Sequence, residues 1–341
     1  MGEYMGKCLC RNSLIKIKMQ KSKIHALPAG RQIKIQKEVK LSLLSTFGIG
    51  GKAGEYIKVS GPREIVEVIS FLDQEGKKYS LFAGGSNVVF GDEGIDGTAV
   101  QIKGGKYAGN MREMVADSGM DLSDAINEGM KKGLSGLESL SGIPGTVGGA
   151  VVGNAGAYGH SISEVVEGVE VLEGSKSREG RMSRRWMSRE ECRFDYRESI
   201  FKKEKFIVLR VLLKFKEGSR EELEKISREI IKLRTAKYHP GLKCPGSFFK
   251  NVLVRDVGEE VLERVDQDVI IDGKIPAGYL LSEVGAKGMR EGGIEIASYH
   301  GNLFINRGGG KAADVRKLAG ILKEKVMERF GIKLVEEIRY F

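Results

Sequence analysis

The sequence predicts an α+β protein with more than one domain. Its 341 residues exceed what one ordinary hydrophobic core organises. A strand–helix–strand pattern over residues 56–83 ends in a glycine turn, where open α/β sheets commonly bind ligands. Later segments contain β-branched strands and then one long amphipathic helix. We therefore expect sheets and helices divided among three units, at 41–104, 105–216 and 217–341.

The first unit begins with alternating apolar and polar residues, a strand pattern. Proline in the first helical turn and a glycine stop then delimit a helix. The expected elements are a strand over 56–59, a helix from Pro62 to just before Gly76, and strands over 79–83 and 98–102. The segment 84–87, read as GGSN, fits either a hairpin turn or a ligand-binding turn.

Sequence patterns of the same kinds predict helices and strands in the second and third units. The second is expected to hold a helix over 123–132, strands over 165–172 and 206–215, and a solvated hairpin or loop over 175–189 that carries Trp186. A capping box at 219–222 opens the third. It is expected to hold a helix with Leu223, Ile226, Ile230 and Leu233 on one face, and a final helix over 312–330.

The stretch 142–159, GIPGTVGGAVVGNAGAYG, holds seven glycines in eighteen positions. Ordering so much glycine is costly, so the backbone itself is expected to be the functional surface. Bare N–H groups can approach a phosphate-bearing ligand closely. A flexible linker is the alternative, although the interleaved valines favour an ordered, buried turn. Neither GxGxxG opening a helix after a strand nor GxxxxGK[ST] occurs.

The net charge of +10 is concentrated at one end of the chain. Residues 1–40 hold ten Lys and Arg against two Glu, so the remainder is nearly neutral. This distribution argues against a DNA-binding face and favours an appended extension, which we expect to be disordered; a basic amphipathic arm stays open. Four cysteines in no zinc pattern favour a reducing cytoplasm, and no apolar run is long enough to span a membrane.

Three further segments carry polar groups among apolar neighbours. Arg197 follows an aromatic residue, although a surface ion pair would use the same residues. Ser247 and Asn251 lie in a segment with two phenylalanines, which also fits a strand with a polar edge. Glu337 near the terminus would ordinarily be a solvated strand end. None of these shows a Ser-His-Asp, paired-carboxylate or metal-ligand arrangement.

Taken together and in order, these segments resemble the MurB family of UDP-N-acetylenolpyruvoylglucosamine reductases from about residue 41 onward. Eight ordered segments are far more specific than any one of them. They are STFGIGGKA (45–53), AGGSNVVF (83–90), GLSGLESLSGIPGTVGGAVVGNAGAYG (133–159), FDYRESIFK (194–202), GSFFKN (246–251), IPAGYLLSEVGAKG (275–288), HGNLFIN (300–306) and LVEEIR (334–339).

The resemblance implies a two-part FAD domain, of the kind found in vanillyl-alcohol-oxidase-like flavoenzymes, followed by a substrate domain. It implies non-covalent FAD, NADPH as hydride donor, and reduction of UDP-N-acetylglucosamine enolpyruvate to UDP-N-acetylmuramate for peptidoglycan synthesis. It also implies a cytoplasmic enzyme, expected as a monomer, without metal, nucleic acid or membrane. Only 36 residues separate Arg197 from Arg234, so the chain resembles the branch without the substrate-covering Tyr loop.

The resemblance also assigns residues. Ser247 would donate a proton, and Arg197 and Glu337 would stabilise an enolate-like intermediate. Lys237, Asn251 and His300 would contact the substrate. The cofactor would be bound by Gly84, Gly85, Ser86, Asn87, Ile143, Pro144, Gly145, Thr146, Gly149, Asn154, Ala155, Gly156, Ala157, Tyr158 and Gly159.

The chemistry explains these residue types. Hydride addition places charge on the substrate carboxylate, so a positioned cation stabilises the transition state more than the ground state. Two other functions fit parts of the sequence. A sugar or alcohol oxidase of the same flavin fold often tethers its cofactor through a histidine, and none lies within or just before 83–87. A basic nucleic-acid-binding protein is disfavoured because the body lacks clustered cations with stacking aromatics.

Overall fold

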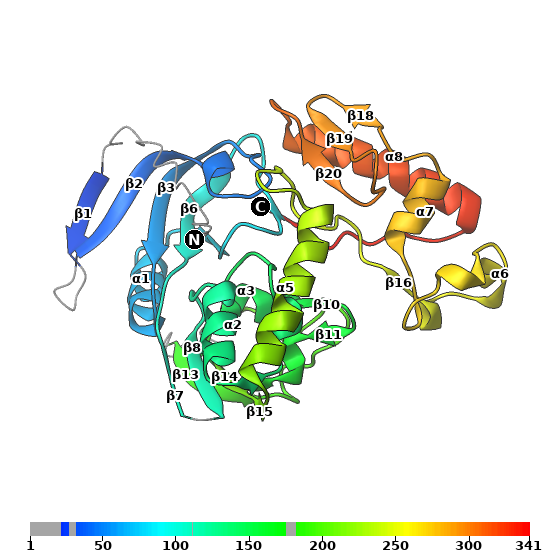
Figure 1. Cartoon of the computed structure of the whole chain (residues 1–341). Coiled ribbons are helices and arrows are strands. Elements are labelled where there is room, and N and C mark those ends of the chain that lie inside the picture. The colour runs from blue at the N-terminus through cyan, green and yellow to red at the C-terminus, as the bar shows by residue number, and fades with distance from the viewer. Residues whose placement is uncertain (1–21, 27–31, 111, 175–181) are drawn as a thin grey trace, which may run out of the picture.

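The computed structural model describes residues 22–26, 32–110, 112–174 and 182–341. The mixed helix and strand content confirms the predicted α+β class. Figure 1 shows one sheet with α1 at one side, a second sheet below it, and a third part that carries the longest helix.

The first sheet has the strand order β1-β2-β3-β6-β4. Its strands are β1 Ser22–Ala26, β2 Gln32–Lys40, β3 Lys52–Val59, β4 Tyr79–Phe82 and β6 Ile95–Ile102. Strands β3 and β4 both run parallel to β6, and helix α1 (Pro62–Gln74) crosses between them. The predicted strand–helix–strand unit is confirmed, and β4 delivers the chain directly into Gly84–Asn87.

Strand β2 corrects one expectation. The extension 1–40 was expected to be disordered, but Gln32–Lys40 pairs with β3 and buries Ile33, Ile35 and Val39. These three apolar side chains lie on the buried face of the strand, between lysine and glutamine residues, so the basic composition concealed a strand pattern. Residues 22–26 form the edge strand β1, while residues 1–21 and 27–31 lie outside the described chain.

The second sheet is antiparallel, in the order β13-β12-β14-β8-β7. Its strands are β7 Tyr107–Gly109, β8 Glu113–Asp117, β12 Val166–Glu173, β13 Ser183–Ser188 and β14 Phe206–Lys214. The associated helices are α2 Leu122–Lys131, α3 Val147–Gly153 and α4 Ile200–Lys203. The span around Trp186 is thus partly a hairpin strand, and residues 175–181 of it lie outside the described chain.

Helix α5 (Arg220–Lys237) begins where the capping box predicts, since the Ser219 hydroxyl accepts the Glu222 N–H at 3.5 Å. Its predicted apolar face is wrong in part. Leu223 is buried in the core of the second unit, whereas Ile226 and Leu233 are 40% and 55% exposed. The helix packs on α2 and on residues 138–140, and most residues of its later turns are exposed.

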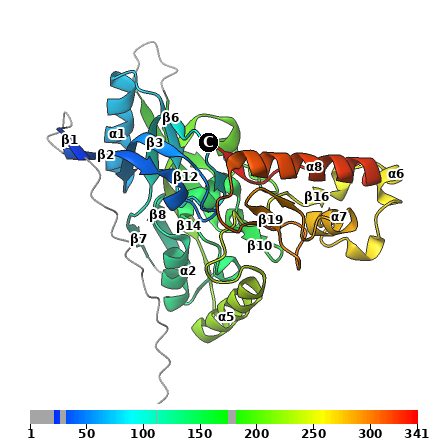
Figure 2. The same ribbon diagram turned by 90° about the horizontal axis from the view of Figure 1, so that it is seen from above.

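The third part combines a small sheet with three helices. Its strands are β18 Arg290–Glu291, β19 Ile294–Ile296 and β20 Phe304–Asn306, and its helices are α6 Glu259–Leu262, α7 Ala277–Glu283 and α8 Ala312–Phe330. Helix α8 lies over this sheet and beside α7 (Figures 1 and 2). Phe248 and Phe304 stack at 3.8 Å between ring centroids, and burying each such ring contributes about 1.5–3 kcal/mol.

Short ladders join distant segments. They are β5 Val88–Val89 with β21 Arg339–Tyr340, β9 Leu134–Ser135 with β15 Lys216–Glu217, β10 Gly156–Ala157 with β11 His160–Ser161, and β16 Val252–Leu253 with β17 Lys274–Ile275. The parallel pairing of β21 with β5 returns the C-terminal strand to the first unit. This return brings the last of the eight motifs, 334–339, beside the second, 83–90.

Candidate active site

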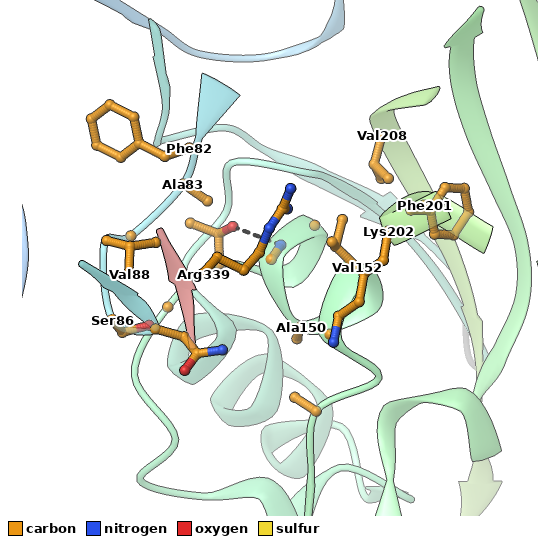
Figure 3. A pocket seen from close by; sticks show the side chains of 18 of the residues that line it. Phe82, Ala83, Ser86, Val88, Ala150, Val152, Phe201, Lys202, Val208 and Arg339 are labelled. Carbon is orange, nitrogen blue, oxygen red and sulfur yellow. Dashed lines mark hydrogen bonds between the residues drawn. The ribbon is translucent and has the colours of Figure 1, made fainter. Parts of the chain in front are cut away.

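A cavity of about 910 Å³ lies where the three parts meet. Figure 3 shows Ser86 and Phe82 from the first unit, Val152 and Lys202 from the second, and Arg339 from β21 around it. Both glycine segments, the 194–202 segment, the 246–251 segment and the C-terminal strand contribute to its lining. The cavity therefore gathers five of the eight predicted motifs.

The segment Gly84–Asn87 forms one wall. Within the described residues, the four N–H groups of this segment donate to no other group of the protein. Gly85 has a φ of +69°, which favours glycine, and a Cβ on Gly84 would lie 2.9 Å from Cα of Gly145. A run of free backbone donors beside a cavity fits the oxyanions of a phosphate-bearing cofactor.

The second glycine segment forms the adjoining wall. Residues 147–153 are helical, which the sequence analysis did not predict, and the Thr146 hydroxyl caps α3 by accepting the Gly149 N–H at 3.1 Å. The Ser86 hydroxyl donates to the Pro144 carbonyl at 3.0 Å. The two glycine segments are thus directly joined, and a linker role for 142–159 is excluded.

Most predicted cofactor residues line this cavity, but four do not. Gly84, Gly85, Ser86, Asn87, Ile143, Pro144, Gly145, Thr146, Gly149, Ala155 and Gly156 line it, whereas Asn154, Ala157, Tyr158 and Gly159 are not among its lining residues. The chain turns into the β10–β11 hairpin there, which leaves Tyr158 50% exposed. Asn154 instead ends α3 and donates to the Asp195 carbonyl at 2.8 Å. We leave these four out of the proposed cofactor site.

Arg197 and Glu337 meet at the cavity. Arg197 lies in a tight turn, closed by Asp195 and Glu198, with a φ of +54° that is unusual for a side-chain-bearing residue. Its Nε lies 3.0 Å from Oε1 of Glu337, and its other nitrogens donate to the carbonyls of Asn154 and Gly156. The guanidinium is therefore held on several sides while still lining the cavity.

The C-terminal strand places Glu337. The Glu337 N–H donates to the Phe248 carbonyl at 2.8 Å, and the Glu337 carbonyl accepts from Nδ2 of Asn87 at 3.1 Å. The terminal segment thus runs between the 246–251 segment and the first glycine segment. Sequence adjacency could not reveal that these three motifs share one wall.

Ser247 has two polar neighbours. Lys237 Nζ donates to its Oγ at 3.4 Å, and Tyr238 Oη lies 3.0 Å from the same oxygen. Tyr238 and Ser247 line the cavity, while Lys237 reaches Ser247 from the end of α5 without being a lining residue. Buried Asn302 fixes this segment by hydrogen bonds to Phe249 at both its N–H and its carbonyl.

Asn251 and His300 differ in position. Asn251 lines the cavity, and its Oδ1 accepts the Ala277 N–H at 3.1 Å, which leaves its amide N–H₂ for a ligand. His300 does not line the cavity; its imidazole lies against Gly278 and accepts the Asn302 N–H at 3.1 Å. Burial, together with the charge of Lys237, lowers the pKa of His300 to about 4, so the ring is neutral at pH 7.

The cavity also contains polar and charged residues that were not assigned a role from sequence, among them Lys202, Tyr238 and Arg339. Lys202 and Arg339 both lie inside quoted motifs and extend into the cavity (Figure 3), and Tyr238 directly follows Lys237. Burial lowers the pKa of Lys202, whose Nζ donates to the Arg197 carbonyl. For Lys202 and Arg339, membership in the motifs was the available signal; Tyr238 lies in none of the eight motifs.

The described residues contain no cluster of three or more metal-ligating side chains and no helix that could cross a membrane. The described cysteines, Cys192 and Cys244, are buried free thiols, and burial raises the pKa of both.

Comparison with known proteins is independent of the geometry described above. Residues 55–176 match the model of an FAD binding domain, and residues 239–341 match the C-terminal domain of UDP-N-acetylenolpyruvoylglucosamine reductase. A protein of that name from Solibacter usitatus is 40% identical over 301 residues, which cover 88% of this chain and 94% of the relative. This chain belongs to the UDP-N-acetylenolpyruvoylglucosamine reductase family.

Other relatives agree with this family assignment. A UDP-N-acetylenolpyruvoylglucosamine reductase from Caldicellulosiruptor bescii is 34% identical over 90% of this chain and 91% of its own. The crystal structure of the MurB reductase from Thermus caldophilus matches with a TM-score of 0.68 at 29% identity, covering 94% of this chain and all of that one. The resemblance predicted from eight motifs is confirmed, as are the FAD domain and the substrate domain of this family.

Proposed function

We propose that Ser247, Arg197 and Glu337 carry out the reduction of UDP-N-acetylglucosamine enolpyruvate that defines this family. The reaction yields UDP-N-acetylmuramate for peptidoglycan synthesis, with FAD as cofactor and NADPH as reductant. The observation that carries the assignment is the meeting of all three side chains at one cavity whose other walls are glycine segments.

The glycine segments fit FAD. The free N–H groups of Gly84–Asn87 would bind the diphosphate of FAD. Where Gly84 contacts Gly145, the absence of side chains leaves the backbone open to the cofactor. FAD, when bound, supplies the hydride-transfer chemistry between NADPH and the substrate. The charged side chains of Lys202 and Arg339 face the same space and favour an anionic ligand.

Arg197 would bind the substrate carboxylate. Charge moves onto this carboxylate as the carbon–carbon double bond is reduced, so the guanidinium stabilises the transition state more than the ground state. Glu337 and two backbone carbonyls hold the Arg197 guanidinium in place. The side chain therefore loses little conformational entropy when the reaction takes place.

Ser247 would donate the proton that completes the reduction. A carbanion beside a carboxylate is basic, so a hydroxyl is an adequate acid. Lys237 and Asn251 would bind the diphosphate or sugar of the substrate. His300, as a neutral ring outside the lining, would act there only through the neighbouring α7 segment. We further propose a monomeric, cytoplasmic enzyme.

The two half-reactions test these roles. In anaerobic stopped-flow experiments, Ser247→Ala should bleach the flavin with NADPH at close to the native rate. Its reoxidation by the enolpyruvyl substrate should slow by roughly 10²–10⁴-fold, the usual contribution of a general acid. Arg197→Lys, which loses the fork, should also slow only the second step. Native reoxidation in Ser247→Ala would assign the proton to another group.

A further inference from the structure

The Ser247 hydroxyl lies in a hydrogen-bonded group that the three proposed catalytic residues do not explain. Tyr238 Oη is 3.0 Å from Ser247 Oγ, closer than Lys237 Nζ at 3.4 Å. Tyr238 ends α5, and its hydroxyl reaches Ser247 while the rest of the side chain lines the same cavity. The Tyr238 hydroxyl therefore contacts Ser247 Oγ, the oxygen that gives up a proton in the proposed function.

The direction of this hydrogen bond decides where the Ser247 proton points. A serine hydroxyl has one proton and two acceptor sites, and a lysine ammonium can only donate. If Tyr238 also donates to Ser247, both acceptor sites are filled and the serine proton is left for the cavity. If Ser247 donated to Tyr238 instead, its proton would point away from a substrate.

Proton transfer from serine alone leaves an alkoxide, the conjugate base of a very weak acid. A phenol is a far stronger acid than an aliphatic alcohol, because its negative charge spreads over the aromatic ring. A second proton transfer from Tyr238 to Ser247 would therefore remove an unfavourable alkoxide. The charge would then rest on a phenolate, which is far more stable.

The surroundings of the Tyr238 ring favour that phenolate. Arg234 Cζ lies 5.2 Å and Lys237 Nζ 5.1 Å from the ring centroid. Two cations over the ring attract negative charge that develops on it during proton transfer. Tyr238 is also only partly buried, so solvent can return the proton.

We propose that Tyr238 is a proton-relay residue that acts through Ser247. The carbanion electron pair forms a C–H bond with the Ser247 proton, the Tyr238 proton moves to Ser247 Oγ, and water reprotonates the Tyr238 phenolate. The net proton comes from solvent, and no further oxidant or reductant is required. This inference rests on the proposed role of Ser247 as proton donor.

Tyr238→Phe tests the relay because it keeps the ring beside Arg234 and Lys237 and removes only Oη. Flavin content and flavin reduction by NADPH should stay native, while reoxidation by the enolpyruvyl substrate slows by roughly 10–10²-fold, with kcat lowered more than KM. In mixtures of H₂O and D₂O, the native reoxidation rate should fall along a curve, as two moving protons require. The variant should give a straight line.

Tyr299→Phe is the matched control. Its hydroxyl donates to the Lys237 carbonyl at 3.1 Å, so the variant loses a tyrosine hydrogen bond in the same neighbourhood without touching Ser247. Its reoxidation rate should stay within about twofold of native. A native rate and an unchanged isotope curve in Tyr238→Phe would overturn the relay.

Two further results separate the relay from the proposed function. If Ser247→Ala is slow while Tyr238→Phe is native, only the relay fails; if Ser247→Ala is native, the donor assignment and the relay fail together. Fluorotyrosines of graded acidity at position 238 keep the hydroxyl and the fold. Their reoxidation rates should vary with phenol acidity, and a constant rate would contradict proton transfer from Tyr238.

Discussion

Lys250 of the 246–251 segment donates a hydrogen bond to Oε1 of Glu198, the residue that follows Arg197. Glu198 also lies 3.8 Å from Nζ of Lys202, whose side chain is 16% exposed. Burial acts to raise the pKa of Glu198, but the hydrogen bond from Lys250 and the charge of Lys202 outweigh it and hold that pKa below its usual range. One carboxylate thus neutralises two largely buried lysines beside the proposed catalytic arginine.

We expect Glu198→Gln to destabilise the fold because it leaves both lysines without their shared counter-charge. The free energy of unfolding should fall by about 2–3 kcal/mol, less than for a fully buried pair since Glu198 is partly exposed. Denaturant titration measures this change. Arg255→Ala breaks the exposed ion pair with Asp195 and should change stability by less than about 1 kcal/mol. Equal effects in the two variants would contradict this interpretation.

Gly84→Ala should reduce FAD binding. The new Cβ would lie 2.9 Å from Cα of Gly145, so the two glycine segments must separate and the row of free N–H groups shifts. The dissociation constant for FAD, from flavin fluorescence titration of the apo-protein, should rise at least tenfold. Gly320→Ala in α8 meets no atom within 4 Å and should bind FAD normally. Native FAD affinity in Gly84→Ala would place the cofactor away from this crossing.

His300 should make the fold less stable as the pH falls from about 6.5 to about 4. Its folded pKa of about 4 lies below the ordinary value of 6.5, so the unfolded chain binds the extra proton first. Linkage gives a loss of about 2 kcal/mol at pH 5 relative to pH 7.5, and none between pH 7.5 and higher values. In His300→Gln, this part of the pH dependence should vanish.

The comparison requires unfolding titrations of both proteins at pH 5 and pH 7.5. His239→Gln, which alters an exposed histidine, is the control and should retain the native pH dependence. If His300→Gln loses as much stability at pH 5 as the native protein does, protonation of His300 does not contribute.

Some of the fold follows from local sequence. Helix α8 begins at Ala312 and ends at Phe330 as predicted, because an apolar stripe at helical spacing and Gly331 define it. The strand–helix–strand unit around α1 was predicted for the same kind of reason. In β2, by contrast, the surrounding lysines made the alternation of buried Ile33 and Ile35 hard to recognise. In α5, Ile226 and Leu233 were predicted to be buried but are exposed.

The sequence by itself determined the family, because each of its eight motifs consists of particular residue types at fixed short spacing. It supplied Arg197, Ser247, Glu337 and both glycine segments as the candidates from which the site is proposed. Only the tertiary structure decided which of these residues meet. The β21–β5 pairing brings Glu337 to Arg197, and the end of α5 brings Tyr238 to Ser247, while the β10–β11 hairpin turns Tyr158 away from the cavity. Contacts between segments far apart in the chain depend on strand pairing and packing, which short sequence patterns do not encode.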